Sequence, residues 1–216
     1  RDVQIVFQDP MAALDPRMRA GDLVAEPLVI HAIGTPEDRR KSVAELFARV
    51  GLTPAQIDRY PHEFSGGQRQ RICIARALAL KPKLIIADES VSALDVSVQA
   101  RVLELLEELK TEFGVAYLFI SHDMAVVENI ADRVAVMYLG QIVEMGSRAQ
   151  IFGNPQHAYT RRLIDAVPVP DPSHARTAHT RPFGEVPSPV LPVGQSPRRV
   201  VLQDQGEGHL VAVQDA

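Results

Sequence analysis

Two acidic residues and a histidine follow apolar runs that are typical of β-strands. Asp88 and Glu89 come directly after residues 84–87, and His122 comes shortly after residues 115–120. The carboxyl ends of parallel strands meet at one edge of a sheet, so we expect these side chains to converge there. A carboxylate at such an edge can hold Mg²⁺, and a second can orient an attacking water. Taken alone, the acidic pair also fits a solvated strand end, and the histidine fits a capping or core residue.

A second candidate site is a serine and two glycines at the start of a predicted helix. Ser65 precedes Gly66, Gly67 and Gln68, and helical periodicity covers residues 66–80, so we expect Ser65 to be the N-cap. The free N–H groups and positive dipole end of a helix bind anions, and glycines let a phosphate approach the backbone. An ordinary glycine turn before a helix is the alternative for this motif alone.

Two further polar residues stand at comparable positions. Gln8 follows the β-rich run of residues 3–7, and Asp95 precedes a helical pattern over residues 97–113. An aspartate at a helix N-terminus interacts favourably with the helix dipole. Each residue is uninformative by itself, and its meaning depends on the other motifs.

The elements predicted around these residues form an α/β pattern. Residues 84–87 and 115–120 are continuous apolar runs, as in strands buried on both faces. Further along, residues 134–138 form a third predicted strand, and helical patterns cover residues 97–113 and 124–131. Strands that alternate with helices in this way predict a parallel sheet.

The remaining segments are predicted from periodicity and turn residues. We expect helices over residues 11–60, with breaks at the glycine and proline residues of 34–36 and 51–54. We also expect a hairpin over residues 134–143, two short helices at residues 148–152 and 157–166, and a terminal strand at residues 209–213. Eight of the 16 prolines lie in residues 168–216, which predicts an extended arm after residue 167.

Composition excludes several classes of protein. The chain has 216 residues, 46% of them hydrophobic, which is enough for a packed core. A formal net charge of −4 argues against a general nucleic-acid binder. Cys73 is the single cysteine, so no disulfide can form within the chain and a reducing compartment fits. Because Arg1 already lies in a strand-like run, we expect the natural N-terminus to precede it.

Taken together, the motifs resemble those of the ATP-binding subunits of ABC transporters. The resemblance covers residues 1–172 closely and the remaining tail loosely. Five motifs of that family occur in the same chain order. The Q-loop matches residues 6–10 (VFQDP), and the signature motif matches residues 64–71 (FSGGQRQR). The Walker B motif with its catalytic glutamate matches residues 84–89 (LIIADE), the D-loop matches residues 92–95 (SALD) and the H-loop matches residues 120–123 (ISHD).

A narrower resemblance is to the oligopeptide/dipeptide importer branch of this family. The segments that carry it are residues 60–64 (YPHEF), 91–99, 137–140, 153–160, 184–189 and 208–212. The chain departs from the usual branch pattern at Ser90 and Ala158, where proline is usual or frequent, and at Cys73, where glycine is frequent. None of the three departures falls on a catalytic position.

The resemblance implies a P-loop NTPase-like α/β fold, with a parallel sheet, a helical subdomain and a Pro-rich C-terminal arm, but without its N-terminal part. It also implies four segments. Residues 1–10 would be the Q-loop strand and a remnant of the core, and residues 11–80 the helical signature subdomain. Residues 81–166 would be a RecA-like core with Walker B, D-loop and H-loop, and residues 167–216 an oligopeptide-transporter-type tail.

The resemblance also implies roles for the candidate residues in ATP hydrolysis. Glu89 would polarise the attacking water, and His122 would contact the γ-phosphate and keep Glu89 oriented. Asp88 and Gln8 would help to hold Mg²⁺. Residues 65–68 would bind the γ-phosphate of ATP held by a partner subunit, and Asp95 would link the two sites.

No phosphate loop of the form G-x-x-x-x-G-K-[ST] occurs in the sequence. Only Lys41-Ser42 and Lys110-Thr111 have the right ending, and neither pair follows a glycine. The family's missing region would lie before Arg1. We therefore expect this segment alone to bind ATP poorly and to show no turnover.

The resemblance implies partners and a location as well. It implies a second ABC ATPase subunit (identical or a paralogue), two transmembrane permease subunits and, indirectly, a solute-binding protein. It places the protein at the cytoplasmic face of the bacterial inner membrane as a peripheral subunit. The expected solute is a peptide, with nickel, glutathione or an oligosaccharide as alternatives. A soluble ABC-type ATPase, or a truncated fragment that supplies only the signature face, remains an alternative function.

Overall fold

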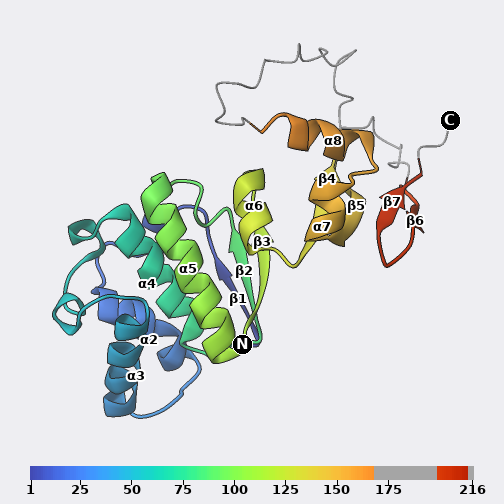
Figure 1. The fold of residues 1–216 in the computed structure, drawn as a ribbon. Coiled ribbons are helices and arrows are strands. Elements are labelled where there is room, and N and C mark those ends of the chain that lie inside the picture. Colours follow the sequence, from blue (N-terminus) through green and yellow to red (C-terminus); the bar gives the residue numbers. More distant parts are fainter. Residues whose placement is uncertain (168–198, 214–216) are drawn as a thin grey trace, which may run out of the picture. The chain divides into compact units, whose positions relative to one another are not determined.

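The computed structural model describes residues 1–167 and 199–213. The chain divides into two compact units, Arg1–Asp123 and Met124–Ala216. Each unit has its own sheet, and each is described by itself (Figure 1). The four-segment division expected from the family resemblance stays a prediction.

The first unit contains a three-stranded parallel sheet. Its strands, in spatial order, are β1 (Val3–Val6), β2 (Leu84–Asp88) and β3 (Ala116–Ile120). All three were predicted as strands from their apolar runs. Because the strands are parallel, their carboxyl ends lie at one edge of the sheet, which is where Gln8, Glu89 and His122 follow them along the chain.

Only one face of this sheet is buried within the described part of the chain. Val6, Ile85 and Ala87 are buried, whereas Ile5 and Leu118, which lie on the opposite face, are exposed. The prediction that the strands are buried on both faces is therefore wrong for the residues described. A continuous apolar run indicates that both faces are suited to burial, but it does not say what covers each face.

Two helices, α4 (Gly66–Leu78) and α5 (Val96–Phe113), lie beside this sheet, and a cluster of further helices packs on α4 (Figure 1). Helix α4 contacts β1 and α5. The other elements of the unit are α1 (Pro10–Ala13), α2 (Ala20–Ile30), α3 (Pro36–Arg49), η1 (Pro54–Gln56) and η2 (Pro61–Glu63).

The predicted helix breaks in this cluster have clear local causes. Gly34 and Gly51 adopt positive φ angles of 66° and 70°, which glycine tolerates and which end a helix. Thr35 then begins α3 as its N-cap in a capping box with Asp38. The core of the cluster is formed by large apolar residues that are almost fully buried, among them Leu23, Val24, Phe47, Ile72 and Ile74.

The second unit is built on a four-stranded antiparallel sheet with the order β4-β5-β7-β6. Its elements in chain order are α6 (Met124–Ile130), β4 (Arg133–Tyr138), β5 (Gln141–Ser147), α7 (Arg148–Gly153), α8 (Ala158–Asp165), β6 (Leu202–Asp204) and β7 (Leu210–Ala212). Val134, Val136, Val143 and Ile151 form its core.

One strand prediction is corrected by this topology. The hairpin expected over residues 134–143 is confirmed, because β4 pairs antiparallel with β5. The expectation that residues 134–138 also belong to the parallel sheet is wrong, because this hairpin lies in the separate sheet of the second unit. The link between β4 and β5 consists of Leu139 and Gly140, both with positive φ. Such a two-residue turn joins antiparallel neighbours, because a parallel crossover needs a dozen residues or more.

The C-terminal strand prediction is confirmed, although it was incomplete. Strand β7 falls within the expected residues 209–213 and pairs with β5. Its second partner, β6, was not predicted. The Pro-rich residues 168–198 lie outside the described residues. No helix of the described part of the chain combines the length and the apolar character that crossing a membrane requires.

Candidate functional site

Glu89 occupies an unusual backbone conformation at the end of β2. Its φ angle is +44°, in the left-handed region that non-glycine residues seldom adopt. The Glu89 N–H donates to the carbonyl oxygen of Ile120 at 2.9 Å, and the Glu89 carbonyl accepts from the N–H of Ser92 at 3.1 Å. The chain thus turns sharply at Glu89 while the residue stays fixed to the neighbouring strand. Such backbone strain clusters at functional sites.

The carboxylate of Glu89 is held from two sides by residues that follow the other two strands. Nε2 of Gln8 donates to Oε2 of Glu89 at 2.6 Å. Nδ1 of His122 lies 3.1 Å from Oε1, and it donates there when Nδ1 carries a proton. The Glu89 side chain is 28% exposed and that of His122 is 70% exposed, so Glu89 is partly buried while the imidazole faces solvent. The three strand ends therefore bring together an amide, a carboxylate and an imidazole.

Asp88 completes the polar edge of the sheet. It is the last residue of β2, it pairs with Ile120 in the strand register, and it is half-buried. Gln8 contacts Glu89 through its Nε2 atom. Its Oε1 atom can therefore bind a cation or accept a hydrogen bond. In residues 1–167 and 199–213, no group of three or more His, Cys, Asp or Glu side chains could hold a metal ion. A hard cation bound here would thus need further oxygen ligands from a substrate and water, as Mg²⁺ commonly has.

The second group of candidate residues lies at the start of α4. Ser65 is the N-cap, as predicted, because its Oγ accepts from the N–H of Gln68 at 3.4 Å. In return, Oε1 of Gln68 accepts from the N–H of Ser65 at 3.0 Å, which completes a capping box. The N–H groups of Gly66 and Gly67 belong to the first turn, where a helix leaves its donors unpaired. This helix tip can bind an anion.

Gly67 also has a packing role that the sequence pattern did not predict, whereas Gly66 has room for a side chain. A Cβ atom on Gly67 would lie 2.4 Å from Cγ1 of Val98, and one on Gly66 would lie 3.7 Å from Cδ2 of Leu94. The N-termini of α4 and α5 therefore lie side by side, and any side chain at position 67 would push them apart. Asp95 is the exposed N-cap residue of α5, and its side chain makes no capping hydrogen bond.

The predicted site residues therefore form two separate groups, and the residues within each group lie close to one another. Gln8, Glu89 and His122 make up the first, with Asp88 next to Glu89 in the chain. The second consists of residues 65–68 together with Leu94, Asp95 and Val98. The first group can orient a water and accept its proton, and the second can bind the negative charge of a phosphate.

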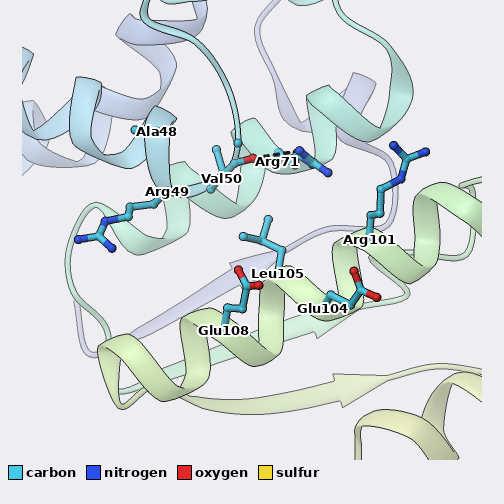
Figure 2. Close-up of a pocket in the computed structure, with 9 residues that line it drawn as sticks. Ala48, Arg49, Val50, Arg71, Arg101, Glu104, Leu105 and Glu108 are labelled. Carbon is cyan, nitrogen blue, oxygen red and sulfur yellow. Dashed lines mark hydrogen bonds between the residues drawn. The ribbon is translucent and has the colours of Figure 1, made fainter.

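A surface hollow of about 240 Å³ lies apart from both groups, between the C-terminal end of α3, α4 and α5. Figure 2 shows that α5 contributes Arg101, Glu104 and Glu108, and that Arg71 reaches from α4 to the carbonyl oxygen of Val50 at 3.3 Å. The hollow carries charges of both signs. None of the predicted site residues lines it.

Comparison with known families identifies the class of protein. The family described as "ABC transporter" matches residues 1–92, and the family described as "Oligopeptide/dipeptide transporter, C-terminal region" matches residues 143–191. Two separate regions of the chain thus match models of ABC transporter proteins, as the sequence motifs predict. The resemblance to the oligopeptide/dipeptide branch is confirmed by the second match.

Curated relatives of this chain include two bacterial proteins that are named as import proteins. The chain is 57% identical over 212 residues to the glutathione import ATP-binding protein GsiA of Pectobacterium atrosepticum. It is 60% identical over 212 residues to the protein of the same name from Salmonella typhimurium. Each match covers 98% of this chain and 34% of the relative, so the chain spans about a third of the length of these relatives.

A solved structure confirms the predicted fold class. It is cbiO1 from Clostridium perfringens, described as part of the ABC transporter complex cbiONQ. The similarity has a TM-score of 0.64 at 31% sequence identity and covers 71% of this chain and 60% of that one. The α/β architecture is thus that of an ABC ATPase.

Proposed function

We propose that the full-length protein containing this chain hydrolyses ATP to power an ABC importer. The observation that carries the proposal is the carboxylate of Glu89, held at the strand ends between Gln8 Nε2 and His122 Nδ1. A carboxylate fixed in this way can take a proton from an attacking water as the bond to the terminal phosphoryl group breaks.

The residues around Glu89 have complementary roles in this proposal. Gln8 and His122 hold the carboxylate in one orientation, and the exposed imidazole of His122 is free to contact a phosphate. Asp88 and Oε1 of Gln8 would help to hold Mg²⁺, and their oxygen atoms are the ligand type that this ion prefers. When bound, Mg²⁺ would neutralise charge on the phosphates and fix their position.

The tip of α4 would act on a second nucleotide. We place the γ-phosphate of ATP bound by a partner ATPase subunit at residues 65–68, where unpaired N–H groups and the helix dipole favour negative charge. Asp95 lies at the start of α5, next to the N-terminus of α4. We therefore propose that Asp95 links the two ATP sites across the interface with the partner ATPase subunit. The close packing of Gly67 on Val98 supports this placement, since it fixes the two helix ends relative to each other.

The proposed solute is a small peptide, with glutathione as the first candidate. Two relatives that are 57% and 60% identical are named as glutathione import proteins, and the match at residues 143–191 is to an oligopeptide/dipeptide transporter region. That regional match also favours an importer over a soluble ABC-type ATPase. The proposed partners are a second ATPase subunit, two membrane permease subunits and a solute-binding protein, at the cytoplasmic face of the inner membrane.

The phosphate loop that ATP binding needs does not occur among the 216 residues, so the proposal assigns activity to the full-length protein. The test is reconstitution of that protein with its permease subunits and solute-binding protein in liposomes. We expect ATP-dependent uptake of radiolabelled glutathione, and no uptake without ATP. Turnover without uptake of glutathione or of other small peptides would contradict the importer assignment.

A further inference from the structure

The strained turn at Glu89 needs a stabilising contact beyond the strand itself. A φ of +44° is unfavourable for a residue with a side chain, and it persists only when neighbouring groups hold it. The direction of the Glu89 carboxylate depends on this backbone angle. Any loosening of the turn would therefore move the carboxylate relative to Gln8 and His122.

Ser92 supplies such a contact. Its Oγ donates to the carbonyl oxygen of Glu89 at 2.9 Å, and its backbone N–H donates to the same oxygen at 3.1 Å. Ser92 thus donates two hydrogen bonds to the carbonyl oxygen of Glu89, three residues earlier, and these bonds close a tight turn. The carbonyl is fixed on one side by Ser92, and the Glu89 N–H is fixed on the other by Ile120 at 2.9 Å.

We propose that Ser92 is a positioning residue that holds Glu89 in its strained conformation and thereby aims the carboxylate. The inference rests on the proposed function, because it takes Glu89 as the group that activates water. It assigns to Ser92 a role within its own chain. Ser92 makes this contact through its hydroxyl group, so threonine should preserve the function and alanine should remove it.

The first experiment measures the turn itself. Hydrogen exchange is followed by mass spectrometry in the peptide covering residues 89–94 of the full-length protein, in wild type and in Ser92→Ala. We expect about fivefold faster exchange in the variant, the factor that the loss of one ordinary hydrogen bond gives. Ser97→Ala, the same change at an exposed position five residues later, should leave this exchange unchanged. Equal exchange in Ser92→Ala and wild type would overturn the proposal.

The second experiment separates positioning from folding through ATP turnover of the same proteins. We expect Ser92→Ala to lower kcat by about ten- to a hundredfold with KM changed less than twofold, since a misplaced catalytic group costs rate and not binding. Ser92→Thr should stay within about twofold of wild type in kcat. A kcat for Ser92→Ala within twofold of wild type, or a loss of activity in Ser92→Thr equal to that in Ser92→Ala, would overturn the proposal.

Glu89→Gln, measured in parallel, separates failure of this inference from failure of the proposed function. If Glu89→Gln is inactive and Ser92→Ala is fully active, the base assignment stands and the positioning role of Ser92 is wrong. If Glu89→Gln keeps wild-type turnover, the proposed function of Glu89 fails, and a positioning role of Ser92 in catalysis fails with it.

Discussion

Oε1 of Glu144 lies 2.8 Å from Nε2 of His209, and both side chains are buried in the second unit. The same carboxylate accepts hydrogen bonds from the N–H groups of Gln156 at 2.7 Å and His157 at 3.0 Å. One buried acid therefore connects β5, the start of α8 and the turn before β7. Gly146 leaves room for this contact, since a Cβ there would lie 3.2 Å from the His209 ring.

We expect Glu144→Gln to loosen the C-terminal hairpin of β6 and β7. The amide cannot replace the charge-assisted hydrogen bonds, and the loss should be about 2 kcal/mol in the free energy of unfolding. Hydrogen exchange at β7, together with urea unfolding, measures the effect. Glu128→Gln, a change of the same kind in α6, should stay within about 0.5 kcal/mol of wild type. Unchanged protection of β7 in Glu144→Gln would contradict the linking role.

The Glu144 contact also predicts a pH dependence of stability. Burial by itself would raise the pKa of Glu144, but hydrogen bonds from Gln156, His157 and His209 hold the pKa below its ordinary value of 4.5. A lowered folded-state pKa means that the stabilisation is complete above pH 4.5 and is lost as the pH falls through the folded-state value. Wild type should therefore lose more stability than Glu144→Gln between pH 5 and about 3. Parallel pH profiles for the two proteins would contradict this.

Gly67→Ala tests the close packing of α4 on α5. The new methyl group would lie 2.4 Å from Cγ1 of Val98. We therefore expect the free energy of unfolding, measured by thermal denaturation, to fall by about 1–3 kcal/mol. The double change Gly67→Ala with Val98→Ala removes the clash and should recover most of that loss. Gly153→Ala is the matched control, because a Cβ there meets nothing within 4 Å. A Gly67→Ala protein as stable as wild type would contradict the packing role.

Cys73 should be chemically inert in the folded protein. Burial in α4 raises the pKa of its thiol to about 12, so almost no reactive thiolate exists at pH 8. We expect very slow labelling by a thiol-specific disulfide reagent in buffer. Labelling of this thiol should become rapid in urea. Rapid stoichiometric labelling of Cys73 in the native protein would show that the helix opens readily at this position.

Sequence reasoning located the site residues where their positions depend on local patterns. Glu89 and His122 could be placed because parallel strands align their carboxyl ends, and Ser65 because N-caps have a strong local preference. The hairpin of residues 134–143 could also be predicted, from the turn at Gly140. Its first strand was wrongly assigned to the parallel sheet as well, because an apolar strand of this kind suits either type of sheet.

Other features depend on contacts that no local pattern specifies. The packing of Gly67 on Val98 joins two helices 31 positions apart, so the glycine was read only as a place for phosphate to approach. Ser92 lies three residues after Glu89, but the hydrogen bond from its hydroxyl group to the Glu89 carbonyl depends on the positive φ of Glu89. No sequence pattern predicts that φ angle. The buried Glu144–His209 pair joins residues 65 positions apart.

The central claim is that Glu89 activates the water that attacks ATP. Glu89→Gln in the full-length protein tests it most directly, since the amide keeps the shape of the side chain but cannot accept the proton. We measure steady-state phosphate release and equilibrium binding of ATP in the same preparation. The account predicts that turnover is lost while ATP binding is preserved. Turnover near the wild-type rate in Glu89→Gln would contradict it.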